Sequence, residues 1–284
     1  MTSCLPIGTK ALNPQEPQQY HEKATIQQER ALENLAGWNF YSYDRVLDVG
    51  CGPGKITASI AGQVPNGSVV GIDISSSMCE QARNQYTSNN LTFIQGDARS
   101  IPDEYEDSFD KVTCFAVLSW IPLEDHQQIF NQIAKSLKIG GKALSRMSAE
   151  GDRPLNQAAK KVIENFRWKE FFIDFILPAA YQNERRLQEI AEEANLNVVK
   201  IEDATTTRKF NTKDEFVEWL LTWEPHRLAI EESSRRQFMY EVVEEYCSSL
   251  KEIIHNECIP ITLPGILIEV EKRKPQSLSM YTQV

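Results

Sequence analysis

The stretch "RVLDVGCGPGKIT", Arg45 to Thr57, decides the fold class of this chain. A short apolar run ends in three alternating glycines, Gly50, Gly52 and Gly54, and a helical pattern follows at once. Glycines in such a turn let the backbone bend tightly and approach a ligand with no Cβ in the way. The stretch therefore predicts a strand, a ligand-binding turn and a helix, which open a nucleotide-binding α/β fold.

Strand and helix patterns continue to alternate after this turn. Their lengths are typical of parallel βαβ units in a doubly wound sheet. We expect Ser77 and Glu80 to form a capping box at the start of one helix, and Gly140–Gly141 to close another. The expected strands are 45–50, 68–74, 91–97, 109–117 and 142–148, and the expected helices are 55–64, 75–86 and 124–141.

After about Ser148 the pattern changes to helices that are rich in aromatic side chains. We expect helices at 155–181 (broken at Pro178), 183–196, 212–223 and 238–250, one long strand at 197–210 and a last strand or hairpin at 259–272. No linker rich in serine or glycine divides the chain, so a single domain is predicted. It is expected to comprise a loose arm at 1–19, one domain at 20–274 with a core at 44–148 and a helical cap at about 152–180 and 211–254, and a tail at 275–284.

Composition excludes several classes of function. The chain has 284 residues, 41% of them hydrophobic, and a formal net charge of −10, which makes nucleic acid an improbable partner. The six cysteines are scattered, and no pair has the spacing of a metal site or a redox motif. No apolar run reaches the roughly 18 residues of a membrane span. We therefore expect a cytoplasmic protein that holds no metal and acts on a small molecule, with an oligomeric state that the sequence leaves open.

The glycine turn discriminates between two classes of nucleotide. A dinucleotide fold prefers G-x-G-x-x-G, but here Lys55 stands where the third glycine would be. Asp48 is expected to face the same mouth, where a carboxylate would repel a diphosphate and attract an ammonium group. S-adenosylmethionine has an ammonium, a sulfonium and no phosphate. The charges therefore favour S-adenosylmethionine over NAD.

Further candidate residues follow the next strands, at the edge where such sheets bind ligands. Asp73 suits the two ribose hydroxyls, Asp97 with the small Ala98 suits the edge of an adenine, and Phe115 ends the fourth strand. The full set that we expect around the cofactor is Tyr20, Asp48, Gly50, Cys51, Gly52, Gly54, Asp73, Ile74, Met78, Asp97, Ala98 and Phe115.

The segments "VLDVGCGPG", "GIDIS", "QGDARSIP", "FDKVTCFAVLSW" and "LKIGGKAL" together resemble the successive motifs of class I S-adenosylmethionine-dependent methyltransferases. The resemblance covers about a third of the chain. It implies a Rossmann-like sheet of seven strands whose last strand is antiparallel, a strand that "GILIEVEK" could supply.

A narrower resemblance rests on "YHEKATIQQERALENL", "LSW" and "RWKEFFIDFILPAAY". These segments resemble juvenile hormone acid O-methyltransferases and, more loosely, trans-aconitate methyltransferases, which methylate carboxylates of small molecules. The resemblance implies that Tyr20 and Gln27 lie in an N-terminal helix at the site and that Trp120 lies beside the substrate. One departure is Ser119, because the first group commonly has histidine at this position.

The chemistry favours a carboxylate as methyl acceptor. A carboxylate, with an unperturbed pKa of about 4, is ionised at neutral pH and needs no general base. Gln27 and Trp120 are the expected catalytic donors to one of its oxygens, since amide and indole N–H groups orient it without adding charge. The residues expected to contact an acceptor, a hydrophobic or polycarboxylic acid, are Arg146, Trp168, Phe172, Trp223 and His226.

Other functions stay open at this point. A phenol or amine acceptor would need a base, for which His226 or Glu224 is the candidate. An NAD-dependent oxidoreductase is disfavoured by Lys55 and Asp48. A protein that binds the cofactor without catalysis would be expected to have lost the loop glycines or Asp73, and neither is lost.

Overall fold

The computed structural model of the protein describes residues 25–250 and 258–274, with side chains from residue 31 onward. Tyr20, the predicted arm at 1–19 and the predicted tail at 275–284 therefore lie outside the described residues. Gln27 falls within helix α2 (Thr25–Ala36), but its side chain is outside the described part.

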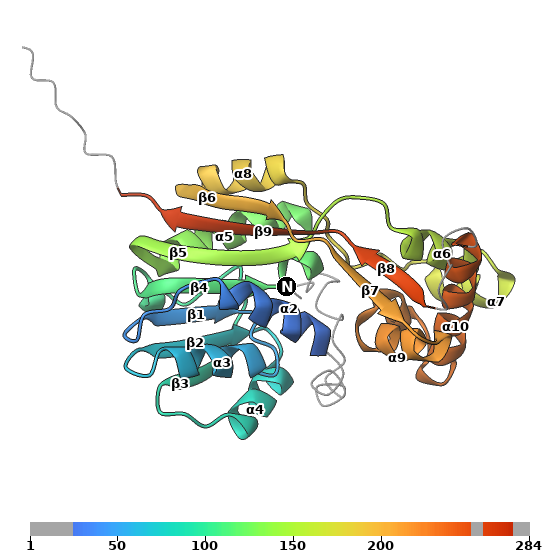
Figure 1. Ribbon diagram of the computed structural model, residues 1–284, viewed down its shortest axis with the longest axis horizontal. Helices are drawn as coiled ribbons and strands as arrows, with labels where there is room; N and C mark the ends of the chain where they lie inside the picture. Colours follow the sequence, from blue (N-terminus) through green and yellow to red (C-terminus); the bar gives the residue numbers. More distant parts are fainter. Residues whose placement is uncertain (1–24, 251–257, 275–284) are drawn as a thin grey trace, which may run out of the picture.

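A seven-stranded sheet in the order β3-β2-β1-β4-β5-β9-β6 forms the centre of the molecule (Figure 1). Neighbouring strands are parallel except β9, which runs antiparallel to both β5 and β6. The predicted doubly wound sheet is confirmed, and "GILIEVEK" forms its antiparallel strand. The strands are β1 (Arg45–Val49), β2 (Ser68–Asp73), β3 (Leu91–Gln95), β4 (Phe109–Phe115), β5 (Leu137–Ser148), β6 (Leu196–Asp203) and β9 (Gly265–Lys272).

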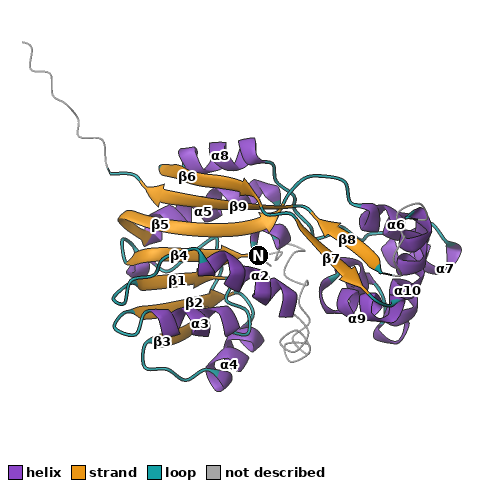
Figure 2. Ribbon diagram, viewed as in Figure 1, coloured by secondary structure: helices purple, strands orange, loops and turns teal. Residues whose placement is uncertain are grey.

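Helices cover both faces of this sheet (Figure 2). Helices α3 (Lys55–Gln63) and α4 (Ser76–Gln85) lie with α2 on one face, and α5 (His126–Ser136) and α8 (Glu184–Glu193) lie on the other. The central strands β1, β2 and β4 are buried on both sides, as their continuous apolar runs require. This arrangement brings the carboxyl ends of the parallel strands to one edge, where the candidate site lies.

A second layer of structure, the cap, lies beyond that edge and has its own hydrophobic core (Figure 1). Phe216, Phe238 and Val242 are almost fully buried within it. Besides the predicted helices, the cap contains a small two-stranded sheet that the sequence did not suggest. Its elements are α6 (Pro154–Ile163), α7 (Phe166–Lys169), η5 (Glu170–Phe172), β7 (Thr206–Phe210), α9 (Lys213–Trp223), η6 (Pro225–Ala229), α10 (Glu232–Ser249) and β8 (Ile259–Leu263).

Two of the chain segments that join core and cap run directly from one sheet to the other. The single strand predicted at 197–210 is wrong: β6 pairs with β9 in the main sheet, and β7 pairs with β8 in the cap. The chain turns between them because the Asp203 carboxylate accepts a hydrogen bond from the Thr205 amide at 2.7 Å. Pro264 separates β8 from β9 in the same way, so 259–272 is not a hairpin. We call residues 203–206 and 263–265 the neck.

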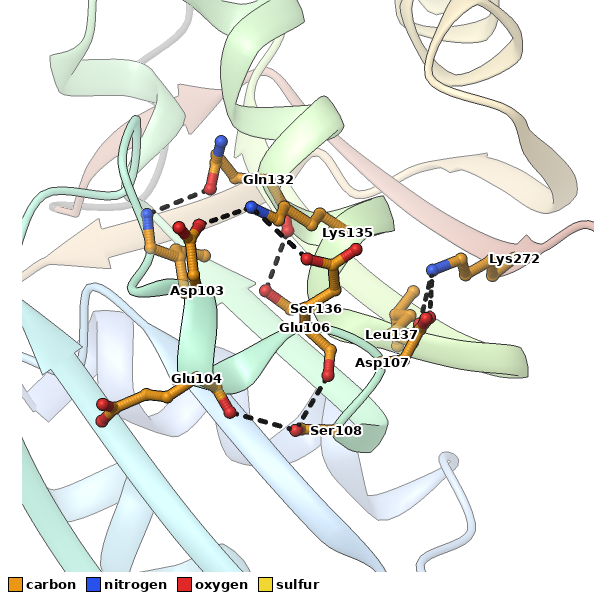
Figure 3. Close-up of polar contacts among 11 residues, drawn as sticks. Asp103, Glu104, Glu106, Asp107, Ser108, Gln132, Lys135, Ser136, Leu137 and Lys272 are labelled. Carbon is orange, nitrogen blue, oxygen red and sulfur yellow. Dashed lines mark hydrogen bonds and ion pairs between the residues drawn. The ribbon is translucent and has the colours of Figure 1, made fainter.

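Two predicted helix ends are also wrong. Helix α5 ends at Ser136 and not at Gly140–Gly141, because the amides of Asp107 and Ser108 donate to the carbonyls of Lys135 and Ser136. Leu137 is then free to start β5. Figure 3 shows how this end of the sheet is fixed, with Lys135 paired to Asp103 and Glu106 and Lys272 paired to Asp107.

Helix α4 begins earlier than the predicted capping box. Ser75 is its N-cap, with an oxygen that accepts a hydrogen bond from the Met78 amide at 3.3 Å. The long helix predicted at 155–181 is broken as well, because Asn165 caps a new short helix, α7. Local signals thus give the helices but not all of their ends.

Candidate functional site

The glycine turn forms a loop between β1 and α3. The Gly50 and Cys51 amides donate to the Ile72 carbonyl at 2.7 and 3.1 Å, which ties the loop to β2. Gly50, Gly52 and Gly54 all have positive φ, at +71°, +51° and +85°. A Cβ on Gly50 would lie 2.1 Å from Val117, whereas a Cβ on Gly52 would meet nothing within 4 Å. Gly52 therefore marks the open side of the loop, where a ligand can approach the backbone.

Asp73 lies beside this open side, at the end of β2. Its carboxylate accepts hydrogen bonds from the amides of Gly52 and Ser75, both at 2.9 Å, so its position is fixed by the loop. The next residue, Ile74, is a large apolar side chain that is 47% exposed, and Met78 is buried in the following helix. A held carboxylate next to an exposed apolar surface suits a ribose with its attached base.

Asp48 lies beneath the loop and does not face its mouth, which corrects the expectation from the sequence. Only 3% of it is exposed. One carboxylate oxygen accepts from the Thr57 hydroxyl at 2.6 Å and the other from the Thr113 hydroxyl at 2.7 Å. Burial raises the pKa of Asp48 to about 6. Its charge can act on a bound cation from below the loop, without direct contact through a free oxygen.

The other expected cofactor residues occupy different environments. Asp97 is held by its neighbour Arg99, which contacts both carboxylate oxygens at 2.7–3.1 Å and keeps the pKa of Asp97 below its usual value. Ala98 is partly buried against the core. Phe115 and Cys51 are buried, with Phe115 at the end of β4 and Cys51 packed in a small cluster with Ala82 and Phe93.

A cavity of about 120 Å³ lies between the carboxyl ends of β4 and β5 and the cap. Trp120, which ends the short helix η3 (Leu118–Trp120), and Arg146, near the end of β5, line its core side. Trp219 and Trp223 of α9 line its cap side. The cavity is therefore built jointly by core and cap, and its walls are mostly aromatic and aliphatic.

Arg153, at the N-cap of α6, also lines the cavity, although no sequence motif pointed to it. Its guanidinium lies 3.7 Å above the Tyr181 ring and donates to the carbonyls of Ala149 and Pro264. Arg146 donates to the Ala204 carbonyl at 2.9 Å. Among the described residues neither arginine has an ion pair with a carboxylate, and burial lowers the pKa of both.

The turn that carries Trp120 is fixed from three sides. The Ser119 hydroxyl oxygen accepts from the Ser148 amide at 2.9 Å, and its carbonyl accepts from the Ala180 amide at 2.9 Å. The buried His126 Nε2 lies 2.9 Å from the Leu118 carbonyl and 3.0 Å from that of Ile121. Since carbonyls only accept, Nε2 carries the proton. Ser119 thus has a structural role at the position where the sequence departs from the resembled family.

Three of the expected acceptor residues lie elsewhere than predicted. Trp168 is 2% exposed in the core of the cap, where its indole donates to Glu241 at 2.6 Å. Phe172 packs against the same core. Neither lines the cavity. His226 is buried behind the wall, and the lining residue is its partner Glu224. Of the five expected acceptor residues, Arg146 and Trp223 lie at the cavity.

Two features are absent from the described residues. No cluster of three or more histidine, cysteine, aspartate or glutamate side chains has the arrangement of a metal site there. Within the same ranges no helix has both the length and the apolarity to cross a bilayer.

Comparison with known proteins agrees with the fold and the glycine loop. Residues 46–141 match the model of a methyltransferase domain family. The chain is 27% identical over 208 residues to "Putative methyltransferase 235L" of Invertebrate iridescent virus 6, covering 73% of this chain and 76% of that protein. It is 33% identical over 136 residues to the trans-aconitate 2-methyltransferase of Deinococcus radiodurans, covering 48% of this chain and 50% of that protein.

The match to this trans-aconitate 2-methyltransferase thus spans about half of that relative's length. Among solved structures, the YcgJ protein of Bacillus subtilis superposes with a TM-score of 0.60 at 17% identity, over 87% of this chain and 99% of that chain. The open side at Gly52, the fixed Asp73 carboxylate and the buried Asp48 beneath the loop suit a cationic donor without phosphate. The match of residues 46–141 to a methyltransferase domain family, the curated relatives and the fold together support a class I S-adenosylmethionine-dependent methyltransferase, with S-adenosylmethionine as its cofactor.

Proposed function

We propose that the enzyme transfers the methyl group of S-adenosylmethionine to a carboxylate oxygen of a small organic acid. The observation that carries the proposal is the cavity between the carboxyl ends of β4 and β5 and the cap, which is apolar in most of its wall but is also lined by Arg146 and Arg153. Guanidiniums bind carboxylates through paired N–H groups. An acid with an apolar body would satisfy both features of the cavity.

Unpartnered donors in the wall support the same class of acceptor. Within the described residues, the indole N–H groups of Trp219 and Trp223 and the Nε–H of Arg153 have no acceptor. A buried donor without a partner costs about 1–3 kcal/mol, so such groups are rare in folded proteins. A ligand that brings oxygen acceptors would reduce this cost, directly or through water.

The names of the relatives point in the same direction. Several curated relatives at 29–33% identity are named trans-aconitate 2-methyltransferases, and trans-aconitate is a carboxylic acid. The matched segments cover about half of these proteins, so the acceptor of this chain is inferred from its own cavity. The apolar walls favour an acid with a hydrophobic body.

The chain's residues have positioning roles in this reaction. S-adenosylmethionine, when bound, supplies a methyl group on a sulfonium; the O–CH₃ bond forms as the S–CH₃ bond breaks, giving a methyl ester and S-adenosylhomocysteine. We propose that the indole of Trp120 and the amide of Gln27 orient one carboxylate oxygen, and that Arg146 holds the acid. Because the acid is already ionised, no base is needed, and correct alignment can contribute roughly 7–11 kcal/mol.

The cap completes the proposed site by excluding water from it. We propose that core and cap form a single domain, with the core at 44–148 and with β7 and β8 as part of the cap. We also propose that the enzyme works in a reducing compartment such as the cytoplasm, because the described cysteines are free thiols.

The experiment is a screen of carboxylic acids, phenols and amines with the isotopically labelled donor, read by mass spectrometry. The expected product is a methyl ester, which alkali hydrolyses with loss of the label. A labelled ether or methylamine that survives alkali would contradict the proposal, and the buried pair of Glu224 and His226 would then be the candidate base. Arg146→Ala should lower kcat/KM for the acid, with donor affinity unchanged.

A further inference from the structure

Glu224 is a buried acidic group that carboxylate methylation does not require. It is the C-cap of α9 and lies where η6 begins, on the cap side of the cavity. Its side chain is only 4% exposed. A carboxylate in such a place is costly unless its oxygens have donors. Its position in the wall of the acceptor cavity therefore calls for an explanation.

One of its two oxygens is occupied by His226. His226 Nδ1 lies 2.6 Å from Oε1, and because a carboxylate only accepts, Nδ1 is the donor. The imidazole packs against the adjacent rings of Phe172 and Phe175, whose centroids are 6.1 and 5.8 Å away. In the part of the chain that the structure describes, Oε2 receives no hydrogen bond. Glu224 thus presents one oriented acceptor on a wall where the other polar groups are mainly donors.

The charges around the cavity restrict what can bind to this oxygen. The charged residues among its described lining are Arg146, Arg153 and Glu224, so cations outnumber anions. His226 adds a further donor on the carboxylate. A ligand ammonium at Oε2 would bring another positive charge close to Arg153, whereas a hydroxyl would donate to Oε2 without adding charge. A neutral hydroxyl therefore fits better.

We propose that the acceptor is a hydroxy acid, which binds across the cavity. Its carboxylate lies on the core side, at Trp120 and Arg146, and its hydroxyl donates to Glu224 on the cap side. Glu224 is then a specificity-determining residue and His226 a positioning residue. The inference rests on the proposed carboxylate methylation and names the class of acid.

The test compares straight-chain alkanoic acids with ω-hydroxyalkanoic and ω-aminoalkanoic acids of the same chain lengths. Methyl ester formation by the full chain with S-adenosylmethionine gives kcat/KM for each acid. At the best length, we expect the hydroxy acid to exceed the plain acid by about 10- to 100-fold, the worth of a hydrogen bond to a charged group. The ω-aminoalkanoic acids should show no such gain in kcat/KM over the plain acids.

Glu224→Gln should abolish this preference. The amide oxygen must turn to the His226 donor, which leaves an NH₂ group toward the cavity in place of an acceptor. Glu232→Gln, the same change at an exposed position of the cap, is the matched control and should keep the preference. His226→Asn, which keeps a donor near the Nδ1 position, should retain more of the preference than His226→Leu.

The outcomes separate the proposed carboxylate methylation from the inference that the acceptor is a hydroxy acid. If acids are esterified but hydroxyl-bearing and plain acids react equally at every length, or if Glu224→Gln keeps the preference, the inference is wrong and the proposed function stands. A preference for the ω-aminoalkanoic acids would also overturn the inference that the acceptor is a hydroxy acid. If no acid of the panel or of the wider screen is esterified, the proposed function itself fails. If thermal melting and donor binding show that Glu224→Gln does not fold, the inference is decided by the ratio of kcat/KM for the hydroxy acid to that for the plain acid in the unmodified enzyme.

Discussion

Substitution of Asp48 by asparagine tests how the charge beneath the donor loop is held. Asp48 is 3% exposed, and its oxygens accept hydrogen bonds from Thr57 and Thr113. Asparagine has nearly the same shape, and a threonine hydroxyl can accept as well as donate, so both contacts can persist. The substitution therefore removes the negative charge and changes little else.

The expected magnitude follows from the pKa of the buried group. Burial raises it from 3.8 to about 6, and one pKa unit corresponds to about 1.36 kcal/mol, so the ionised form costs about 3 kcal/mol of stability. Because the folded protein binds this proton more tightly than the unfolded chain, stability falls as the pH rises through the interval from 3.8 to about 6. Asp48→Asn escapes this cost, so its stability relative to the parent should increase by about 2–3 kcal/mol between pH 4 and pH 8.

Urea denaturation of both proteins across this pH range measures the difference, since other titrating groups contribute equally to each. Asp174→Asn, at an exposed position, is the control and should show no pH-dependent difference. The affinity for S-adenosylmethionine should change in the opposite direction and fall in Asp48→Asn, because the donor is cationic. A stability difference that is constant with pH, or one that shrinks as the pH rises, would refute the reasoning.

The loop and the cavity give further predictions. Gly52→Ala should cost only about 1 kcal/mol of stability, the strain of a positive φ, yet strongly weaken donor binding in calorimetry, because its methyl group enters the open side of the loop. Gly50→Ala should destabilise the fold more, and Val117→Ala should partly restore it, because the new Cβ would lie 2.1 Å from the Val117 side chain. Trp120→Ala should reduce methyl transfer far more than donor binding, and equal activity would remove Trp120 from the mechanism. Trp168→Ala should instead lower the melting temperature and reduce the free energy of unfolding by about 3–5 kcal/mol, because that side chain lies in the core of the cap.

The donor side of the site could be predicted from the sequence because its determinants are local. Gly50, Gly52 and Gly54 form the tight turn that their pattern indicated, and all three have positive φ. Asp73 ends β2, the strand that comes one βα unit after the glycine turn, so its place beside the loop could be expected. Asp48 shows the limit of this reasoning. Its position in the chain was informative, but the direction of its side chain depends on Thr57 and Thr113, from two other elements.

The prediction of helix ends failed where contacts from distant parts of the chain cap the helix. The glycine pair 140–141 is the stronger local stop signal, yet α5 ends at Ser136, because the loop that precedes β4 donates to its last carbonyls. The strand predicted at 197–210 failed for a related reason. No glycine or proline interrupts the sequence over 197–210, but the partners on either side of the neck belong to different sheets. Partner choice is a long-range property that periodicity does not contain.

The acceptor side could not be predicted because the neck assembles it from distant segments. Arg146 is bound to the Ala204 carbonyl and Arg153 to the carbonyls of Ala149 and Pro264, so both guanidiniums are fixed at the junction of core and cap. Each guanidinium has five N–H donors in a rigid fork, so anchoring some of them orients the rest. The match to the methyltransferase domain family ends before this junction, at residue 141, and the last motif, "LKIGGKAL", ends at Leu144. They therefore define the donor, whereas the acceptor depends on how the cap meets the core.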